Sequence, residues 1–246
     1  MYYFASDVHL GAGDELKSRH TESRFVKWLD MVAQDAEGIF LMGDIFDFWF
    51  EYNRVIPKGF VRTLGKLAEL TDRGIKITFI TGNHDMWMYD YLQRECGVEI
   101  CFSPQEVTIS GKQLFLAHGD NMNIKDKPLL RLMNTTFRSR SARKIFSWLV
   151  HPDLAMKFGK WWSEKSRLSH SKEILDVDAL DFLVDYARSY KQSNPQTDYI
   201  VFGHMHIPHD LREEDLRVLF LSSWEGDAAY AVLDRQGNIE LKTFAL

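Results

Sequence analysis

The sequence predicts an α/β fold in which two β-sheets pack as a sandwich and helices flank them. Short apolar runs bounded by Gly or Asp have the pattern of buried strands. Amphipathic segments between several of these runs predict helices that pack on a sheet. Strand pairs at the beginning and end of the chain indicate the two sheets. The strand-like runs are residues 2–5, 39–42, 77–81, 114–117, 199–202, 219–222 and 228–233.

Three segments carry apolar residues at helical spacing, which predicts helices with one buried face. The first spans about residues 21–36. The second, residues 64–71, ends before Gly74, where a helix C-cap is expected. The third begins near Val177. Residues 234–238, Asp-Arg-Gln-Gly-Asn, predict the turn of a closing hairpin.

The length of 246 residues suits a single domain, residues 1–246, with an inserted helical lid at about residues 121–172. The two cysteines, Cys96 and Cys101, lack the spacing of a metal site, so we expect reduced thiols. The N-terminus lacks the pattern of a signal peptide, and no apolar run approaches the roughly 20 residues of a membrane span. We therefore expect a cytoplasmic protein.

Five short blocks of metal-ligating residues follow five of the strand-like runs. Residues just beyond the C-terminal ends of strands converge on one edge of an α/β sheet, so we expect these side chains to meet. The blocks are residues 7–9 (Asp-Val-His), 43–47 (Gly-Asp-Ile-Phe-Asp), 82–85 (Gly-Asn-His-Asp), 118–120 (His-Gly-Asp) and 203–206 (Gly-His-Met-His).

Seven side chains in these blocks are candidate metal ligands. They offer nitrogen and oxygen but no thiolate, a set that suits Mn, Fe or Zn. Seven ligands are too many for one tetrahedral ion. If one carboxylate bridges, two ions roughly 3.5–4 Å apart each receive four protein ligands, and Asp44 is the candidate bridge. The seven are Asp7, His9, Asp44, Asn83, His118, His204 and His206.

In this order, the five blocks resemble the signature of the calcineurin-like metallophosphoesterases, from residue 7 to residue 206. The resemblance implies a metallophosphoesterase-type fold that binds two divalent metal ions, which we expect to be Mn²⁺. It implies that Asp44 touches both ions. The first would be held by Asp7, His9, Asp44 and His206, and the second by Asp44, Asn83, His118 and His204.

The segment of residues 121–172 carries 12 Lys or Arg against 3 Asp or Glu, although the whole chain has a net charge of −5. It also carries bulky apolar residues such as Phe146, Trp148 and Trp161. The basic character indicates an anionic partner. Three interpretations are open: a lid that packs on the main domain, attachment to a membrane surface, or binding to nucleic acid. We do not expect nucleic acid, because the basic residues match no recognised motif.

The chain also resembles the UDP-2,3-diacylglucosamine hydrolases of lipid A biosynthesis, at residues 43–49, 163–177 and 223–226 besides the metal blocks. The resemblance implies a diphosphatase that cleaves the pyrophosphate bond to give UMP and 2,3-diacylglucosamine 1-phosphate (lipid X). The lid suits this substrate, because two acyl chains need apolar walls and a diphosphate needs cations. The implied substrate contacts are Asn83, His84, Asp126, Ser163, Arg167, His170 and His204.

Three positions depart from the pattern of these hydrolases. Arg167 stands where members have Asn, and His170 stands where they have Lys. His84 stands where enteric members have Arg, whereas the wider superfamily has His. The chain is therefore a divergent relative, and a different phosphoester substrate stays open.

His84 is expected to stabilise or protonate the leaving phosphate oxygen, and Asp47 is placed to orient it. An alternative role for Asp47 is to cap the next helix. One alternative function is a general phosphodiesterase or nucleotide pyrophosphatase. A second is a metal-free scaffold, which the presence of all seven candidate ligands disfavours. We expect a lipid-linked UDP-sugar as substrate, and peripheral attachment to the inner membrane through the lid stays open. We expect neither nucleic acid nor an obligate protein partner.

Overall fold

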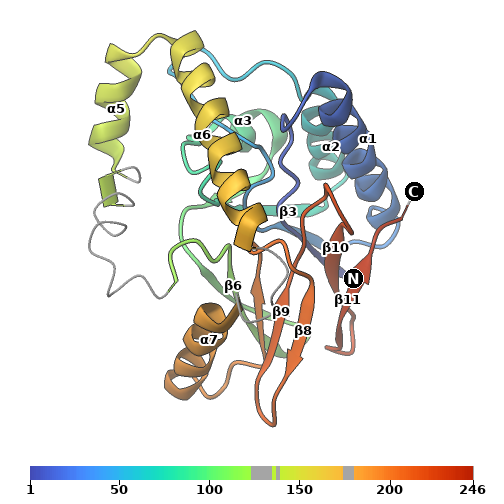
Figure 1. Ribbon diagram of the computed structural model, residues 1–246. Helices are drawn as coiled ribbons and strands as arrows, with labels where there is room; N and C mark the ends of the chain where they lie inside the picture. Colours follow the sequence, from blue (N-terminus) through green and yellow to red (C-terminus); the bar gives the residue numbers. More distant parts are fainter. Residues whose placement is uncertain (123–134, 137–138, 174–179, 246) are drawn as a thin grey trace.

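The computed structural model describes residues 1–122, 135–136, 139–173 and 180–245. These residues form two β-sheets with helices on their outer surfaces (Figure 1). Apolar side chains from both sheets share one buried cluster, so the sheets pack face to face. The predicted α/β sandwich is confirmed.

The first sheet has six strands in the order β11-β10-β1-β2-β3-β4. Strands β1 to β4 are parallel to one another, whereas β10 is antiparallel to both β1 and β11. The last two strands of the chain thus extend the sheet that the first strand begins. The bounds are β1 Tyr2–Ala5, β2 Gly38–Leu41, β3 Lys76–Ile80, β4 Glu99–Cys101, β10 Ala229–Leu233 and β11 Ile239–Thr243.

The second sheet has five strands in the order β5-β6-β7-β9-β8. Its central strands β6, β7 and β9 are parallel, and antiparallel strands close both edges. The bounds are β5 Gln105–Ile109, β6 Lys112–Ala117, β7 Tyr199–Phe202, β8 His209–Arg212 and β9 Arg217–Phe220.

The central strands are apolar on both faces because both faces are covered. In β1, Phe4 points into the layer between the sheets, where its ring stacks on Phe40 with centroids 5.1 Å apart. Its neighbours Tyr3 and Ala5 belong to the layer outside the first sheet. Successive side chains of a strand point to opposite faces of the sheet. Because an apolar layer lies on each face, the sequence of such a strand is continuously apolar.

Helices cover the two outer layers. On the first sheet lie α1 (Glu15–Val32), α2 (Val61–Asp72) and α3 (Tyr91–Cys96), and on the second lies α7 (Asp181–Ser193). Helix α1 begins earlier than the sequence predicted, because the Asp14 carboxylate accepts a 2.8 Å hydrogen bond from the Lys17 amide and caps it. The predicted helix start near Val177 lies outside the described residues.

Two further helices come from the basic, aromatic-rich segment. Helix α5 (Arg140–Leu149) stands to one side of the sandwich, and α6 (Pro152–Glu173) runs down towards the ends of the strands (Figure 1). We call these two helices the lid. Of the helices in the described residues, none is both long enough and apolar enough to cross a membrane.

Candidate metal centre

The seven candidate ligands gather at one rim of the sandwich. The first sheet supplies those that follow β1, β2 and β3, and the second sheet supplies those that follow β6 and β7. Each set of strands is parallel, so its carboxyl ends open to one side. The site thus depends on both sheets. From the first sheet come Asp7, His9, Asp44 and Asn83, and from the second come His118, His204 and His206.

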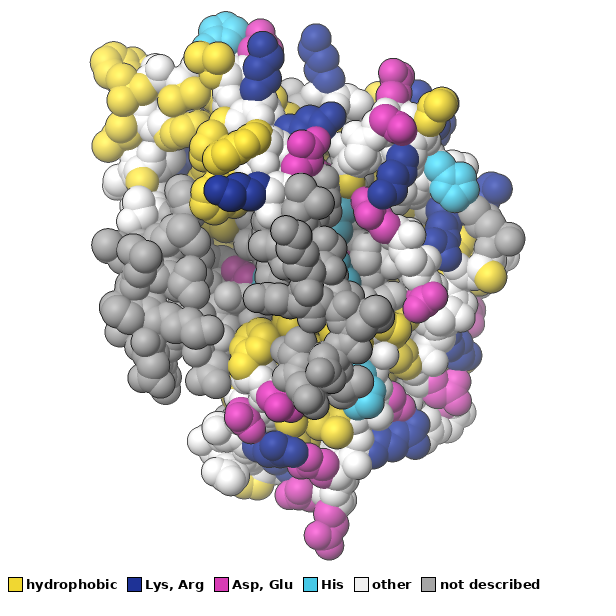
Figure 2. Space-filling view, viewed as in Figure 1, with side chains coloured by type: hydrophobic (Ala, Val, Ile, Leu, Met, Phe, Trp, Pro, Cys, Tyr) yellow, Lys and Arg dark blue, Asp and Glu magenta, His cyan; other side chains and the backbone are white. Residues whose placement is uncertain are grey.

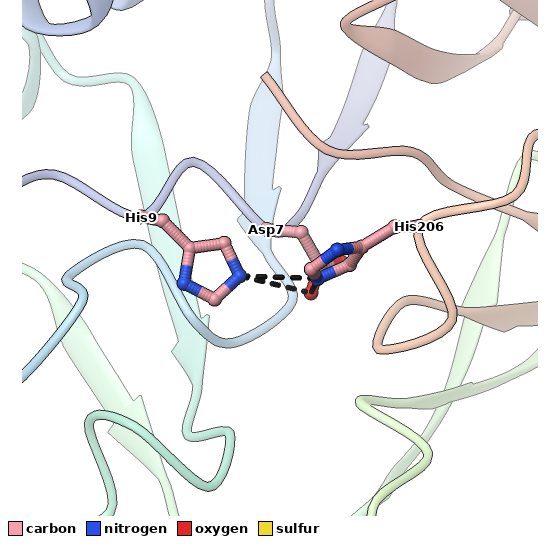
Figure 3. Close-up of side chains that lie close together, drawn as sticks. All are labelled: Asp7, His9 and His206. Carbon is pink, nitrogen blue, oxygen red and sulfur yellow. Dashed lines mark hydrogen bonds and ion pairs between the residues drawn. The ribbon is translucent and has the colours of Figure 1, made fainter. Parts of the chain in front are cut away.

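Asp7, His9 and His206 form one compact group (Figure 3). The Nε2 atoms of His9 and His206 are 3.1 Å apart. Asp7 Oδ1 lies 3.2 Å from His206 Nε2 and 3.8 Å from His9 Nε2. The three donor atoms therefore face one another across a small space.

Asp44, His118 and His204 form a second group, and Asn83 lies beside it. His118 Nε2 is 3.2 Å from Asp44 Oδ2 and 3.2 Å from Asn83 Oδ1. On the other side of the ring, His118 Nδ1 is 2.9 Å from the Met42 carbonyl oxygen. Because a carbonyl can only accept, this contact keeps a proton on Nδ1 and points Nε2 into the group.

These distances fit divalent metal ions. Atoms bound about 2.1 Å from a common ion, at angles of about 90–110°, lie about 3.0–3.4 Å from each other. The closest donor pairs of both groups fall within this range. The buried Asp7 Oδ1 faces the rings of His206 and His9. Imidazole and carboxylate donors of this kind suit Mn, Fe or Zn.

The two carboxylates among the candidate ligands, Asp7 and Asp44, are buried and ionised. Burial alone would raise their pKa values, but the hydrogen bond and charge of His206 lower the pKa of Asp7 to about 2. Neighbouring His118 and His84 likewise hold the pKa of Asp44 well below its ordinary value against the effect of burial. Two buried negative charges require nearby positive charge, which divalent ions provide.

The histidines divide into two classes. Burial, followed by the charges of neighbouring histidines, lowers the pKa of His9 to about 3 and that of His204 to about 4. Their rings are neutral, as a metal ligand must be. Burial also disfavours charge on His118 and His206, but Asp44 and Asp7 outweigh it and raise their pKa values. Protons on these two rings neutralise the carboxylates without metal, and metal binding would release them.

Five of the seven candidate ligands have a left-handed backbone. In the described chain, eight residues other than glycine have a clearly positive φ, and these five are Asp7, His9, Asp44, His204 and His206, with φ between 50° and 70°. This conformation is unfavourable for residues with a Cβ and is concentrated at functional sites. The turns direct each side chain inward immediately after its strand ends.

Gly43 allows the loops after β2, β3 and β6 to meet. Its φ is +86°, and a Cβ there would lie 2.6 Å from His118 Nδ1 and 2.7 Å from the Gly82 amide nitrogen. Both distances are too short for real contacts, so a side chain would displace either His118 or the loop that carries Asn83.

His84 and Asp47 are neighbours, and the Asp47 backbone carbonyl contacts the His84 ring. His84 Nδ1 is 2.7 Å from the Asp47 carbonyl oxygen, and Ser163 Oγ is 3.0 Å from the same nitrogen. The Asp47 carboxylate accepts a 2.6 Å hydrogen bond from Ser163 and lies 3.4 Å from His9 Nδ1. Asp47 therefore contacts the rings of both His84 and His9.

Asp85 is a structural member of the site for which the sequence analysis assigned no role. It is fully buried and accepts hydrogen bonds from the amides of Gly82 at 2.8 Å and Ile45 at 2.9 Å. It thus ties the loop after β2 to the loop after β3. Burial and the charge of Asp44 raise its pKa to about 7. Its place directly after Asn83 and His84 was the available signal.

The substrate contacts implied by resemblance are only partly described. Asn83, His84 and His204 lie in the site, and Ser163 is buried against Asp47. Asp126 lies outside the described residues. Arg167 and His170 belong to α6, but their side chains lie outside the described part of the chain.

Gly43→Ala should lower the free energy of unfolding by more than about 1 kcal/mol, because the added Cβ is strained and collides with two loops. Metal content should fall as well, since His118 must move. Gly65→Ala is the control: Gly65 lies in α2 with no atom near its virtual Cβ, so this change should stabilise by about 0.5–1 kcal/mol. Urea unfolding measures the stability, and elemental analysis measures the metal content. A Gly43→Ala protein with the stability and metal content of the wild type would contradict the tight packing.

Comparison with known proteins agrees with this geometry. A family model described as Calcineurin-like phosphoesterase matches residues 2–208. The UDP-2,3-diacylglucosamine hydrolase of Porphyromonas gingivalis is 37% identical over 94% of this chain and 93% of its own length. The protein of that name from Histophilus somni is 28% identical over 83% of both chains. A solved structure, the phosphoesterase Yfce from E. coli, aligns over 99% of both chains with 17% identity and a TM-score of 0.44.

The family match extends over most of the chain and spans all five metal-ligand blocks. The relative from P. gingivalis is similar along nearly its whole length. The chain therefore belongs to the calcineurin-like phosphoesterases.

Proposed function

We propose that the protein hydrolyses the pyrophosphate bond of UDP-2,3-diacylglucosamine to give UMP and 2,3-diacylglucosamine 1-phosphate. The observation that carries the proposal is the 37% identity, over 94% of the chain, to a protein named for this hydrolysis. A metal centre beside an aromatic-rich lid is consistent with a substrate that joins a diphosphate to two acyl chains. The substrate would be the partner of the protein, and no nucleic acid is needed.

In this proposal, the site holds two divalent ions, with Mn²⁺ as the expected metal. Asp44 also forms a third compact group with His9 and His84, so it lies beside both sets of donors, which supports Asp44 as the bridge. When bound, such ions polarise phosphoryl oxygens and lower the pKa of water. The first ion would be held by Asp7, His9, Asp44 and His206, and the second by Asp44, Asn83, His118 and His204.

Asn83 and His84 are the residues that would act on the scissile phosphate. The Asn83 amide can bind a phosphoryl oxygen and orient it for in-line attack. His84 directs Nδ1 to the Asp47 carbonyl, so Nε2 is the nitrogen that faces the site, 3.8 Å from Asp44 Oδ2. A proton held on Nε2 can pass to the leaving phosphate oxygen.

Apolar surface that could take the acyl chains lies beside the lid. A cleft of about 650 Å³ has aromatic walls from Tyr52, Trp87, Tyr89 and Phe102, and the lid gives it the basic side chains of Arg143 and Lys144. A smaller cavity of about 40 Å³ adjoins Asn83 and His84. Trp87 and Met86 border both spaces, so an elongated apolar group could extend from one to the other.

We propose that residues 121–172 form one inserted lid within a single domain and that its outer face rests on a membrane surface. Trp148 is 84% exposed and Leu149 is 66% exposed, and they lie where α5 approaches α6. Lys144 and Lys157 are also exposed on these helices. Figure 2 shows hydrophobic side chains gathered at this end of the molecule, beside Lys and Arg. Exposed aromatic and basic side chains together suit peripheral attachment to the cytoplasmic face of an inner membrane.

The proposed contacts to substrate are Asn83, His84 and His204 at the metal centre, with Asp126, Ser163, Arg167 and His170 from the lid segment. Those from the lid rest on resemblance alone. The alternative function, a general phosphodiesterase or nucleotide pyrophosphatase, needs the metal centre but not the lid. The two are separated by their substrates.

Incubation with UDP-2,3-diacylglucosamine and Mn²⁺ should release UMP, measured by chromatography, and a chelator should abolish the release. UDP-N-acetylglucosamine, which lacks the acyl chains, and bis-p-nitrophenyl phosphate serve as comparison substrates. Equal or faster turnover of these two compounds would favour the general phosphodiesterase.

Asp44→Ala should remove both metal ions and abolish activity, because the bridging carboxylate serves both. His206→Ala should retain one ion, since it removes a ligand of the first site only. Asp72→Ala, which changes an exposed aspartate at the end of α2, should retain both ions. Elemental analysis after gel filtration counts the metals. Two bound ions in Asp44→Ala would rule out the bridge.

Trp148→Ser should reduce binding to vesicles that contain anionic lipids several-fold, because it removes the most exposed aromatic side chain of the lid. Val61→Ser removes a comparably exposed apolar side chain, 76% exposed, from the start of α2 and should have no effect. Co-sedimentation with vesicles measures both. Equal binding by the wild type and both variants would indicate that the lid does not contact the membrane.

A further inference from the structure

Helix α6 is fastened to the loop after β2 by two contacts one helical turn apart. The first is between Gly159 and Phe48, and the second is between Ser163 and Asp47. Residues four positions apart lie on one face of a helix. The same face of α6 therefore carries both contacts, directly beside the candidate metal centre.

Gly159 permits the close approach. A Cβ built on Gly159 would collide with the ring of Phe48, at the Cγ, Cδ1 and Cε1 atoms. Unlike Gly43, Gly159 has an ordinary helical backbone. Glycine is therefore needed here because it has no side chain, and not because it can adopt a positive φ. The Phe48 ring thus takes the place of a side chain and sets the distance between α6 and the loop.

This distance places the hydroxyl of Ser163 inside the protein. Ser163 is fully buried, and its Oγ donates a 2.6 Å hydrogen bond to Asp47 Oδ1. A hydroxyl has only one proton, so Ser163 Oγ can interact with His84 Nδ1, 3.0 Å away, only as an acceptor. The His84 ring is thus held from two directions, by the Asp47 carbonyl and by the Ser163 oxygen.

The same interactions reach His9. Asp47 Oδ1, the atom that accepts from Ser163, is 3.4 Å from His9 Nδ1. A carboxylate in this position can orient a histidine ligand when the two form a hydrogen bond. Here the approach is a close contact, since His9 Nδ1 has no hydrogen-bond partner among the described residues. Through Asp47, the serine of the lid is thus connected to the candidate proton donor and lies near a candidate metal ligand.

We propose that Ser163 is a positioning residue for the chemical step and that the Phe48–Gly159 contact is the joint that places it. The proposal rests on the proposed function only in that the reaction is the hydrolysis of a phosphoester. It gives Ser163 a role different from the substrate contact implied by resemblance. Because its proton is donated to Asp47, the hydroxyl acts on the chemical step through Asp47 and His84.

The test compares kcat and KM for two substrates, bis-p-nitrophenyl phosphate and UDP-2,3-diacylglucosamine. Ser163→Ala should lower kcat about tenfold on each substrate that the wild-type protein hydrolyses, equivalent to about 1.4 kcal/mol in the barrier. KM and metal content should stay within about twofold. Ser163→Thr keeps the hydroxyl, and the cavity of about 40 Å³ beside it can take the added methyl group, so kcat on bis-p-nitrophenyl phosphate should be retained. Ser147→Ala, on α5, is the control, because among the described residues that hydroxyl bonds its own helix, at the Lys144 carbonyl oxygen.

The Phe48–Gly159 contact is tested separately. Gly159→Ala should lower kcat in the same way, because the new methyl group pushes α6 away from Phe48. Phe48→Leu in the same protein should restore part of the loss by making room, a coupling that simple destabilisation would not produce. Thermal unfolding confirms that each variant is folded.

Other outcomes overturn the proposal. If Ser163→Ala raises only KM, and only for the diacylated substrate, Ser163 is a substrate contact. If it leaves kcat unchanged, or if Ser163→Thr loses as much as Ser163→Ala, the hydroxyl does not position His84. Wild-type hydrolysis of bis-p-nitrophenyl phosphate without release of UMP from the lipid would refute the proposed substrate alone, and the kcat of Ser163→Ala on the small diester would still decide the role of Ser163.

Discussion

Two carboxylates buried at strand ends are the constraint on which the rest of the site depends. Asp7 and Asp44 lie at the ends of adjacent parallel strands, almost completely removed from solvent. Leaving two such charges uncompensated would be very unfavourable. The surrounding histidines, the left-handed turns and the tight approach of the loops all bring positive charge or metal-binding nitrogen towards these two side chains.

The two-sheet architecture follows from the same requirement. The first sheet brings Asp7 and Asp44 together but supplies only one candidate histidine ligand, His9, while the other three histidines come from the second sheet. The apolar layer between the sheets, with Phe4 and Phe40 stacked at its centre, holds the two halves of the site in register. Packing far from the chemistry therefore determines the distances between metal-binding atoms.

The lid is linked to this centre by more than its apolar surface. Its buried serine bonds the carboxylate that faces His9, and a glycine one turn earlier lets the helix come close enough. The same helix has exposed aromatic residues on its outer side, including Trp161. One helix thus has an inner face that contacts the metal-binding loops and an outer face that carries exposed aromatic side chains.

Sequence alone predicted seven of the eleven strands of the described residues, the α/β class, the family and the seven candidate ligands, because each block directly follows its own strand. Such placement is local, and strand direction carries the side chains to one rim. Helix starts were predicted less accurately. Asp14 caps α1, so this helix begins at Glu15, before the apolar pattern that predicted it. Only the tertiary structure decided the partners of Asp47, His84 and Ser163, which are up to 116 positions apart in the chain. Their contacts depend on how closely α6 packs against Phe48, and no periodicity in the sequence encodes the distance between two packed elements.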